Sequence, residues 1–508
     1  MLKNILSVGG YTLISRITGF VRDIVLAAVL GAGAIMDAFS VALRLPNHFR
    51  AIFGEGAVNQ AYVPTYALIA EKDGREAANL FADRLFTIQL IVQIVLLALA
   101  LPLMPWLVTV LAPGFTKDPA VFELAVALTR ITFPYLLFVT MVTFLGATLN
   151  AVERYAAFAA APILLNVFIV AALAVPFLFP SAAHAAAWGV AISGIAQWAL
   201  LYVAARRAGV SGKVVRPRMD AGVRHFLKVF GPAVIGSAGV QIAIFTDGII
   251  ASLLPRGGYA ALYYAERLYQ LPLGLIAIAV GTVALSAMSR AIARGDEAAA
   301  NRAQSRAIAI SLAASAPFVA AFVAVPDMMI AGLFQRGEFD ATASAAAGAV
   351  LFAYALGLPA IVMIRTQVSA FQARGDTMTP MLVALAAIAC NVAIKLLLWR
   401  DWGAPGLALA TAAGAWVNLI VLFVLARRRG LTALDRRLPG FAAIICGVAA
   451  ICGLLAWWGK PLALKLTAAL PFEPRLMAVL LVSSVAALLY AVLAGGLLKV
   501  TGLLRLLR

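Results

Sequence analysis

The feature that most constrains this chain is a succession of fourteen long apolar segments. They lie near residues 5–30, 35–69, 86–111, 122–148, 157–179, 186–205, 226–254, 259–289, 307–326, 344–371, 379–399, 405–426, 439–459 and 476–498. A membrane-spanning helix needs about 20 predominantly apolar residues, and each segment reaches that length. No soluble core could bury so much apolar surface in a chain that is 64% hydrophobic and only 12% charged. We therefore predict an all-α polytopic membrane protein with about fourteen transmembrane helices.

Charged side chains interrupt the first apolar segment and distinguish it from a signal peptide. Arg16, Arg22 and Asp23 lie within it, and no small-residue cleavage site follows. A cleavable signal has an uninterrupted apolar stretch ahead of such a site. We therefore expect these residues to form an uncleaved first transmembrane helix.

The 40 Lys and Arg residues are distributed unevenly between the two sides of the membrane. With a cytoplasmic N-terminus, the segments on that side hold 25 of them and the segments on the other side hold 7. This asymmetry follows the positive-inside rule and predicts a multi-pass inner-membrane protein with both termini cytoplasmic. The membrane orientation thus accounts for the net charge of +18 without a nucleic-acid partner.

Neither cysteine nor histidine has the spacing of a metal site. Cys390, Cys446 and Cys452 lie within apolar runs, and the three histidines are scattered along the chain. Zinc sites instead place their ligands at short, regular spacings. We expect no metal site, no catalytic residue and no bound cofactor.

Basic loops divide the apolar segments into groups of six, six and two. The predicted parts are an N-lobe at 1–207, a C-lobe at 208–430 and two further helices at 431–508. Residues 23–30 align with 247–254, and an arginine recurs in the second helix of each lobe, at Arg44 and Arg267. Six helices is an even number, so both lobes enter the membrane from the same side, as parallel repeats do. We predict two pseudo-symmetric six-helix lobes around a central cationic cavity, plus two extra C-terminal helices.

Five arginines within or at the edges of the predicted spans account for the cationic character of that cavity. They are Arg16, Arg22, Arg44, Arg50 and Arg267. A basic residue at the centre of a spanning helix costs about 2.5–3.5 kcal/mol on insertion scales, so these side chains should face water or each other. Arginine binds phosphate through a bidentate fork, which makes a lipid-linked diphosphate the natural guest.

Nearby acidic side chains leave a second interpretation open. Asp23, Asp37, Glu55 and Glu266 can pair with the arginines, and the candidate pairs are Arg16–Asp23, Arg50–Glu55 and Glu266–Arg267. Static pairs would only lock helices together, as in a scaffold without transport. Pairs that exchange would instead gate the site. Pro46, which lacks a backbone N–H, is expected to kink the second helix beside the arginines.

Several runs resemble the MurJ (MviN) family of lipid II flippases, within the multidrug/oligosaccharidyl-lipid/polysaccharide exporter superfamily. They are Ser15-Arg16-Ile17-Thr18-Gly19-Phe20-Val21-Arg22-Asp23, Gly31-Ala32-Gly33-Ala34-Ile35-Met36-Asp37-Ala38-Phe39, Arg44-Leu45-Pro46-Asn47-His48-Phe49-Arg50, Phe53-Gly54-Glu55-Gly56-Ala57, Ala112-Pro113-Gly114-Phe115, Thr132-Phe133-Pro134-Tyr135, Leu149-Asn150 and Tyr263-Tyr264-Ala265-Glu266-Arg267-Leu268. The resemblance covers nearly the whole chain. It departs from some relatives at Ala51, where they carry a second arginine, and at Gln270, where they carry an acid.

The resemblance implies a transporter that moves lipid II, the undecaprenyl-diphosphate-linked peptidoglycan precursor, from the cytoplasmic to the periplasmic leaflet by alternating access. Together with the charge pattern, it assigns substrate binding to Ser15, Arg16, Arg22, Asn47, Arg50 and Arg267, and gating or charge pairing to Asp23, Asp37, Arg44, Glu55 and Glu266. It also implies that the helices at 431–508 form a groove for the lipid tail. Coupling to the membrane potential or to a monovalent cation, and contact with the cell-wall synthesis machinery, stay open.

Two competing functions make different demands on the sequence. A multidrug exporter of drug cations would line its cavity with carboxylates and aromatic side chains, whereas the first lobe is rich in arginine. An intramembrane enzyme acting on lipid-linked sugars would need catalytic acids beside a sizeable loop, and no loop here is long enough. A related polysaccharide-lipid or multidrug exporter is therefore the nearer alternative.

Overall fold

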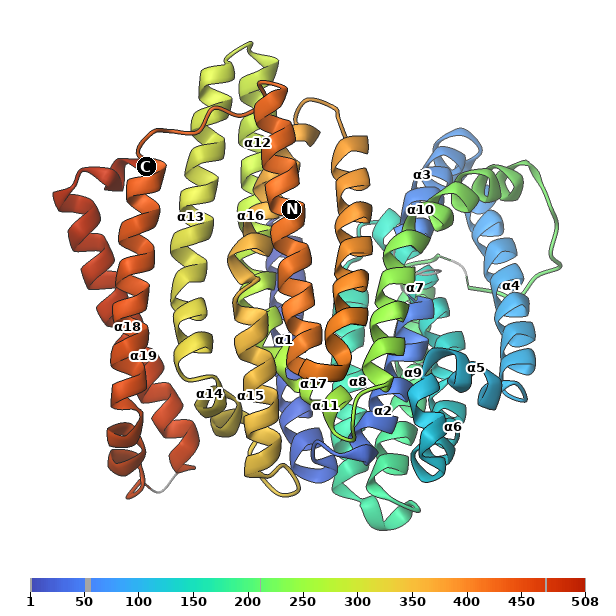
Figure 1. The fold of residues 1–508 in the computed structure, drawn as a ribbon. Coiled ribbons are helices and arrows are strands. Elements are labelled where there is room, and N and C mark those ends of the chain that lie inside the picture. The colour runs from blue at the N-terminus through green and yellow to red at the C-terminus, as the bar shows by residue number, and fades with distance from the viewer. Residues whose placement is uncertain (1, 51–55, 211, 471–472, 508) are drawn as a thin grey trace. The chain divides into compact units, whose positions relative to one another are not determined.

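The computed structural model describes the chain except residues 1, 51–55, 211, 471–472 and 508, and its description of side chains also leaves out residues 2–7, 48–50, 56–60, 233–243 and 278. Every element within this part of the chain is helical (Figure 1). Backbone groups inside a bilayer must form their hydrogen bonds within the protein, and helices satisfy that requirement segment by segment. The predicted all-α class is confirmed.

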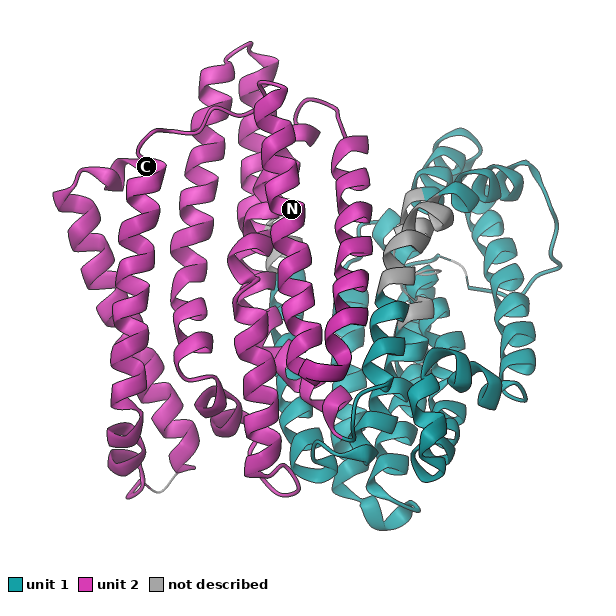
Figure 2. Ribbon diagram, in the orientation of Figure 1, with its two compact units in different colours: residues 1–256 teal, residues 257–508 magenta. Residues whose placement is uncertain are grey.

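The helices group into two compact units, residues 1–256 and residues 257–508 (Figure 2). Unit 1 contains α1 (Leu2–Leu30), α2 (Ala34–Arg50), α3 (Gly56–Lys72), α4 (Gly74–Ala100), α5 (Met104–Leu111), α6 (Pro119–Thr132), α7 (Tyr135–Ala151), α8 (Ala156–Ala174), α9 (Ala182–Arg207) and α10 (Ala221–Ser252). Unit 2 contains α11 (Gly258–Pro272), α12 (Ile278–Ala293), α13 (Glu297–Ala324), α14 (Pro326–Phe334), α15 (Ala341–Ala355), α16 (Leu358–Gln372), α17 (Met378–Arg428), α18 (Leu438–Thr467) and α19 (Pro474–Val500). The predicted lobe boundaries at 207 and 430 stay a prediction.

Ten helical stretches among the described residues are long and apolar enough to cross a membrane. They cover the predicted spans except 5–30, 35–69 and 226–254, which overlap residues whose side chains are not described. The chain is therefore a multi-pass membrane protein, and the count of fourteen helices stays a prediction.

The longest helix, α17, contains two predicted spans. Gly403 interrupts it with φ 53° and ψ −137°, a backbone conformation open mainly to glycine. A Cβ on Gly414 would lie 2.8 Å from the Cβ of Asn391, so the two limbs of α17 run beside each other. This glycine turn therefore joins the two spans as a hairpin.

The fourth predicted span of each lobe is broken near its middle. Phe133 and Pro134 separate α6 from α7, because proline lacks the N–H that would continue the helix. Leu356 and Gly357 separate α15 from α16, and a Cβ on Gly357 would lie 2.7 Å from the Cα of Ala412. The break recurs at the same place in both predicted lobes, as a duplicated fold would produce. The uniform hydropathy of these segments did not reveal it.

The two C-terminal helices, α18 and α19, pack against each other and against α13 within unit 2. Their shared core includes Phe441, Ile445 and Val448 of α18. The hydroxyl of Tyr490 on α19 donates to the backbone carbonyl of Ala313 on α13 at 2.7 Å. The predicted groove for a lipid tail along these helices stays a prediction.

Candidate functional site

A buried polar contact joins α1 to α8 through Arg22. Its Nε and Nη2 donate to Oδ1 of Asp23 at 3.0 and 2.7 Å, and its Nη1 donates to Oδ1 of Asn166 at 2.9 Å. Arg22 is only 9% exposed. A buried charge needs a partner and further hydrogen bonds to offset the loss of hydration, and this site supplies both. Asp23 therefore pairs with the arginine next to it in the sequence.

Asn166 also binds the backbone of α1. Its Nδ2 donates to the carbonyl oxygen of Ser15 at 3.1 Å and to the Thr18 hydroxyl at 3.0 Å. One buried amide therefore fixes both the register of α1 on α8 and the position of the Arg22 guanidinium. Sequence reasoning missed Asn166. The available signal was a lone amide in the apolar segment 157–179, where polar side chains are rare and usually functional.

Next to this contact, α1, α2, α7, α8 and α9 enclose a cavity of about 530 Å³. Three predicted substrate-binding residues, Ser15, Arg16 and Asn47, line it together. The other polar side chains in its wall are Thr12, Tyr135, Thr143, Asn150, Tyr155 and Gln197. None of the described lining residues is acidic, so the cavity presents one guanidinium among hydroxyl and amide groups. This chemistry suits a polar guest that carries negative charge.

Three polar residues of this cavity, Asn150, Tyr155 and Gln197, lie outside the two helices that the charge pattern singled out. Asn150 lies near the end of α7, Tyr155 precedes α8, and Gln197 lies buried on α9. Of these, only Asn150 belongs to a run quoted for the family resemblance, and there it had no assigned role. Their common signal is a polar side chain within or next to an apolar segment.

Asn47 is positioned by the local structure of α2. Pro46 lies inside this helix and has no N–H for the carbonyl of Ala42, four residues earlier. The hydroxyl of Thr132 on α6 donates to that carbonyl at 2.7 Å. The side-chain amide of Asn47 donates to the carbonyl of Leu43 at 2.9 Å. A hydrogen bond from α6 thus holds α2 where its proline would otherwise leave a carbonyl unsatisfied.

The remaining predicted residues of this region, where the structure describes their side chains, do not line the cavity beside Arg16. Asp37 is buried and Arg44 is half-buried, both on α2. The side chain of Arg50 and the whole of Glu55 lie outside the described residues, and so does the predicted pair between them.

Unit 2 places its predicted residues on α11. The guanidinium carbon of Arg267 lies 4.4 Å from the ring centroid of Tyr263, within the range of a cation–π contact. Glu266 accepts a hydrogen bond from Nε2 of Gln270 at 2.8 Å. Gln270 is thus a neutral side chain that donates to the Glu266 carboxylate and stabilises it. The predicted cavity between the lobes stays a prediction.

Asp376 has a structural role in unit 2. Its Oδ1 accepts from the backbone N–H of Thr379 at 2.9 Å and its Oδ2 from Nη1 of Arg429 at 2.9 Å. The hydrogen bonds from Thr379, supported by the charge of Arg429, lower the pKa of this carboxyl. Its oxygens are therefore engaged in holding the turn before α17.

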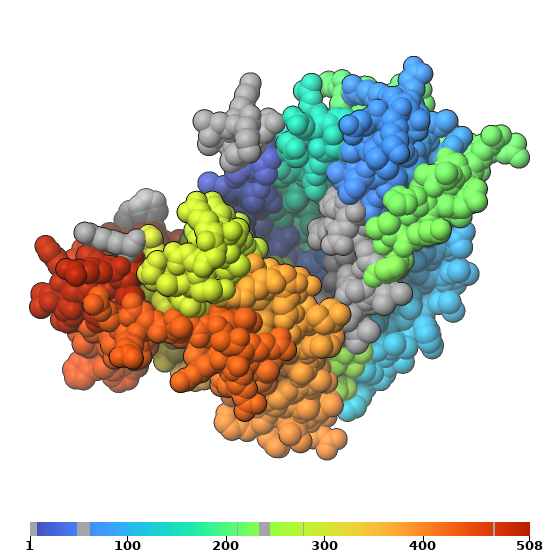
Figure 3. Space-filling view, turned by 90° about the horizontal axis from the view of Figure 1, so that it is seen from above, coloured from blue at the N-terminus to red at the C-terminus, as the bar shows by residue number. Residues whose placement is uncertain are grey.

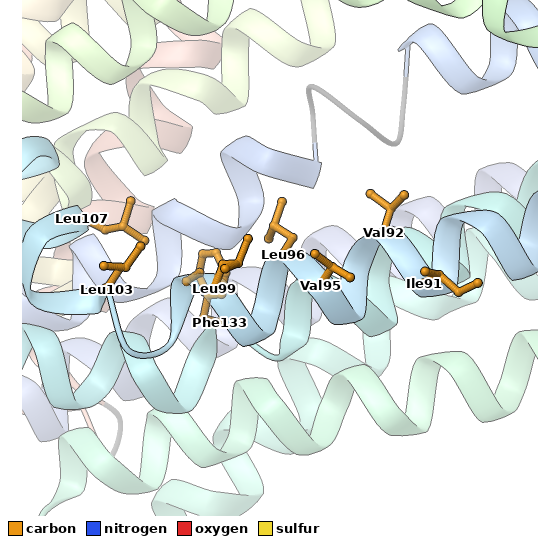
Figure 4. A pocket seen from close by; sticks show the side chains of 9 residues that line it. Ile91, Val92, Val95, Leu96, Leu99, Leu103, Leu107 and Phe133 are labelled. Carbon is orange, nitrogen blue, oxygen red and sulfur yellow. The ribbon is translucent and has the colours of Figure 1, made fainter.

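A second hollow, of about 520 Å³, lies on α4 and α5 (Figure 4). Ile91, Val92, Val95, Leu96, Leu99, Ala100, Leu103, Leu107 and Phe133 line it. These side chains offer no hydrogen bond to a diphosphate or a sugar, whereas the cavity beside Arg16 does. The polar cavity is therefore the candidate site.

Comparison with known proteins identifies a family and a fold that this chain resembles. The family model described as "Lipid II flippase MurJ" matches residues 26–473. A protein of Rhizobium meliloti (strain 1021), named "Probable lipid II flippase MurJ", is 37% identical over 97% of this chain and 94% of its own length. A solved structure, "Lipid II flippase MurJ, inward closed conformation", matches with a TM-score of 0.78 at 22% identity over 97% of this chain and 98% of its own. An inward-facing multidrug resistance MATE transporter shares the fold at a TM-score of 0.68 and 16% identity, over 82% of this chain and 95% of its own.

Proposed function

The chain belongs to the lipid II flippase MurJ family, and from this premise we propose that it translocates lipid II from the cytoplasmic to the periplasmic leaflet of the inner membrane for cell-wall synthesis. The family match over residues 26–473 supports this proposal. The substrate is an undecaprenyl-diphosphate-linked disaccharide-pentapeptide, and the protein acts as a transporter without covalent chemistry. Both termini lie in the cytoplasm, in keeping with the distribution of Lys and Arg.

The observation that carries the proposal is the cavity of about 530 Å³ in unit 1. Arg16 supplies a positive charge for the diphosphate, and Ser15 and Asn47 lie in the same wall. Hydroxyls and amides around them, Asn150 and Gln197 included, match the amide-rich and hydroxyl-rich sugar and peptide head. Arg50 and Arg267 complete the cationic set in this proposal.

The Arg22–Asp23 pair supports the proposed gating role of Asp23, which would control access to the substrate-binding residue Arg22. Asp23 binds the Arg22 guanidinium through two donors, and Asn166 occupies a third. A diphosphate would have to compete with these partners for Arg22. In the proposed cycle, Asp23 and Glu55 exchange with the substrate for the arginines as the two lobes rock. Binding then weakens when the site opens outward.

The driving force in this proposal is the membrane potential or a monovalent cation gradient. Moving one charge across 100 mV is worth about 2.3 kcal/mol. The potential, negative inside, favours return of the empty cationic site to the cytoplasmic side.

Helices α18 and α19 are proposed to guide the polyprenyl tail. The cell-wall synthesis machinery is the proposed consumer of the product.

Complementation in a bacterium depleted of its own lipid II flippase tests the proposal. We expect the wild-type chain to restore growth and periplasmic lipid II, and Arg16→Ala at equal expression to restore neither. Arg16→Lys keeps the charge but loses the planar fork, and we expect a partial effect. Arg302→Ala is the control, because that exposed arginine pairs only weakly with Asp296 at 3.7 Å. Full rescue by Arg16→Ala would show that the cavity does not grip an anion.

The alternative function, a related polysaccharide-lipid or multidrug exporter, predicts a different outcome of the complementation test. The MATE likeness at 16% identity concerns the fold alone. The described wall of the unit 1 cavity contains no carboxylate for a drug cation, so that exporter class is disfavoured. A chain that expels cationic dyes without restoring periplasmic lipid II would favour it.

A further inference from the structure

The segment between α9 and α10 forms a strap held on the surface of α4. We use "strap" for residues 208–220 apart from residue 211. The backbone N–H of Lys213 donates to Oδ1 of Asp83 at 2.8 Å, and that of Val215 donates to the Thr87 hydroxyl at 3.0 Å. Both acceptors are buried side chains of α4. The strap has no regular structure of its own, so these hydrogen bonds hold its backbone in place.

Both ends of the strap are also tied to unit 1. At one end, Nη2 of Arg75 donates to the carbonyl of Ala208 at 2.6 Å. At the other end, Asp220 forms an ion pair with Arg84 and accepts the N–H of Val223 at 2.8 Å, which caps α10. The strap is therefore a fixed platform for the side chains it exposes.

The exposed side chains of the strap and its flanks are strongly basic. Residues 206–228 contain seven Lys and Arg against a single acid, Asp220, which Arg84 neutralises. The exposed cations are Lys213, Arg216, Arg218, Arg224 and Lys228, with Arg206 and Arg207 at the end of α9. The strap thus carries a dense positive charge that Asp220 cannot offset.

Apolar side chains are exposed among these cations. Val214 is 68% exposed and Met219 57%, and both lie within the strap. Leu227 and Val229 follow near the start of α10, each 39% exposed. Figure 3 shows this part of the chain, in green, on the outer surface of unit 1 beside the blue segment that contains α3. A bilayer interface takes both kinds of side chain, because cations meet phosphates and aliphatic groups enter the headgroup boundary.

The position of the strap agrees with that occupant. It follows α9, a candidate membrane span, and leads into the predicted span 226–254 through α10. It therefore lies where the chain leaves the membrane and enters it again. A nucleic acid would use the cations but would gain nothing from exposed Val214 and Met219.

We propose that the strap is a docking surface for anionic phospholipid headgroups, which anchors this face of unit 1 to the membrane surface. Lys213, Arg216 and Arg218 contact the phosphates, while Val214 and Met219 enter the headgroup boundary. This role is independent of the transported substrate.

Lipid titration of the purified full-length chain, followed by native mass spectrometry, tests the proposal. The probes are phosphatidylglycerol and phosphatidylcholine at equal concentration in detergent. We expect wild type to retain phosphatidylglycerol preferentially. In the triple variant Lys213→Gln, Arg216→Gln, Arg218→Gln, we expect its affinity to fall on the order of 100-fold, since each surface cation contributes roughly fivefold. An unchanged preference in this variant would overturn the proposal.

A charge-matched control separates the strap from net charge. Arg427→Gln, Arg428→Gln, Arg436→Gln removes three exposed cations from the basic loop of unit 2 and should leave the preference nearly intact. Val214→Ser, Met219→Ser should weaken phosphatidylglycerol binding while keeping every charge. If inorganic phosphate or a single-stranded oligonucleotide displaces the lipid at equal charge concentration, the strap is a general anion site and the proposal fails. Complementation by the strap variant tests the transport function alone, whereas lipid titration tests the strap alone. Either proposal can therefore fail while the other stands.

Discussion

The hydrogen bond from Thr132 to Ala42 gives a prediction whose size follows from the structure. Thr132 is fully buried, and its hydroxyl lies 2.7 Å from a carbonyl that Pro46 leaves without an intrahelical donor. Thr132→Val keeps the shape and removes the donor. Hydrogen bonds between membrane helices average about 0.6 kcal/mol with a maximum near 1.7. An orphaned buried acceptor costs about 1–3 kcal/mol, so we expect a loss of about 1–2 kcal/mol of unfolding free energy.

A double-mutant cycle with Pro46→Ala isolates this interaction. An alanine at position 46 supplies the missing N–H, so the carbonyl of Ala42 no longer depends on Thr132. In that background we expect Thr132→Val to cost less than about 0.5 kcal/mol. The measurement is equilibrium unfolding by SDS titration in mixed micelles, with helix content followed by circular dichroism.

The matched control is Thr129→Val on the same helix. Its hydroxyl donates to the carbonyl of Ala125 at 2.6 Å within α6, where the helix already provides a backbone donor. We expect that variant to remain close to wild type. An equal loss for Thr132→Val with and without Pro46 would refute the reasoning, because the hydroxyl would then not replace the missing N–H.

Three further predictions concern unit 1 contacts. Asn166→Leu removes the amide that binds Arg22 and the α1 backbone, and we expect a loss of roughly 2–3 kcal/mol of unfolding free energy in SDS titration; an unchanged unfolding free energy would contradict a structural role for these hydrogen bonds. Gly114→Ala places a Cβ 1.9 Å from the carbonyl oxygen of Ser252, and we expect a loss of about 1–3 kcal/mol, visible as a lower melting temperature. The hydrogen bond that Arg256 donates to Asp118 lowers the pKa of that carboxyl. The ion pair therefore contributes to folding stability above the pKa of the unfolded state, and this contribution is lost only as the pH falls through the lowered, folded-state pKa. The stability gap between wild type and Asp118→Asn should thus stay constant from pH 8 to 5 and close below about pH 4, and a gap that closes above pH 5 would oppose this.

Hydropathy predicted the helical class and most spans because the bilayer imposes one requirement on every segment. Hydropathy did not predict the features that tertiary contacts determine. The breaks at Pro134 and at Gly357 lie inside uniformly apolar segments, and at Gly357 a neighbouring backbone approaches where only glycine fits. Hydropathy separates two spans near Gly403, but it does not show the glycine turn that joins them in α17.

The candidate site was predicted in the same uneven way. Ser15, Arg16 and Asn47 were expected to share a site and do line one cavity. Asn166 was missed, because a single amide in an apolar run gives no information about its partner. The pairing of Asp23 with Arg22 was also not anticipated, since helical spacing favoured Arg16.

Prolines inside the spans offer a way to predict such contacts from the sequence. Each one leaves the carbonyl four residues earlier without its helical donor, and lipid cannot supply another. In unit 1 the carbonyl freed by Pro46 receives Thr132 of α6. In unit 2, Pro317 of α13 frees the carbonyl of Ala313, which receives the hydroxyl of Tyr490 from α19. The second case joins α19, which has no counterpart in the predicted repeat, to α13 at the carbonyl that this proline frees.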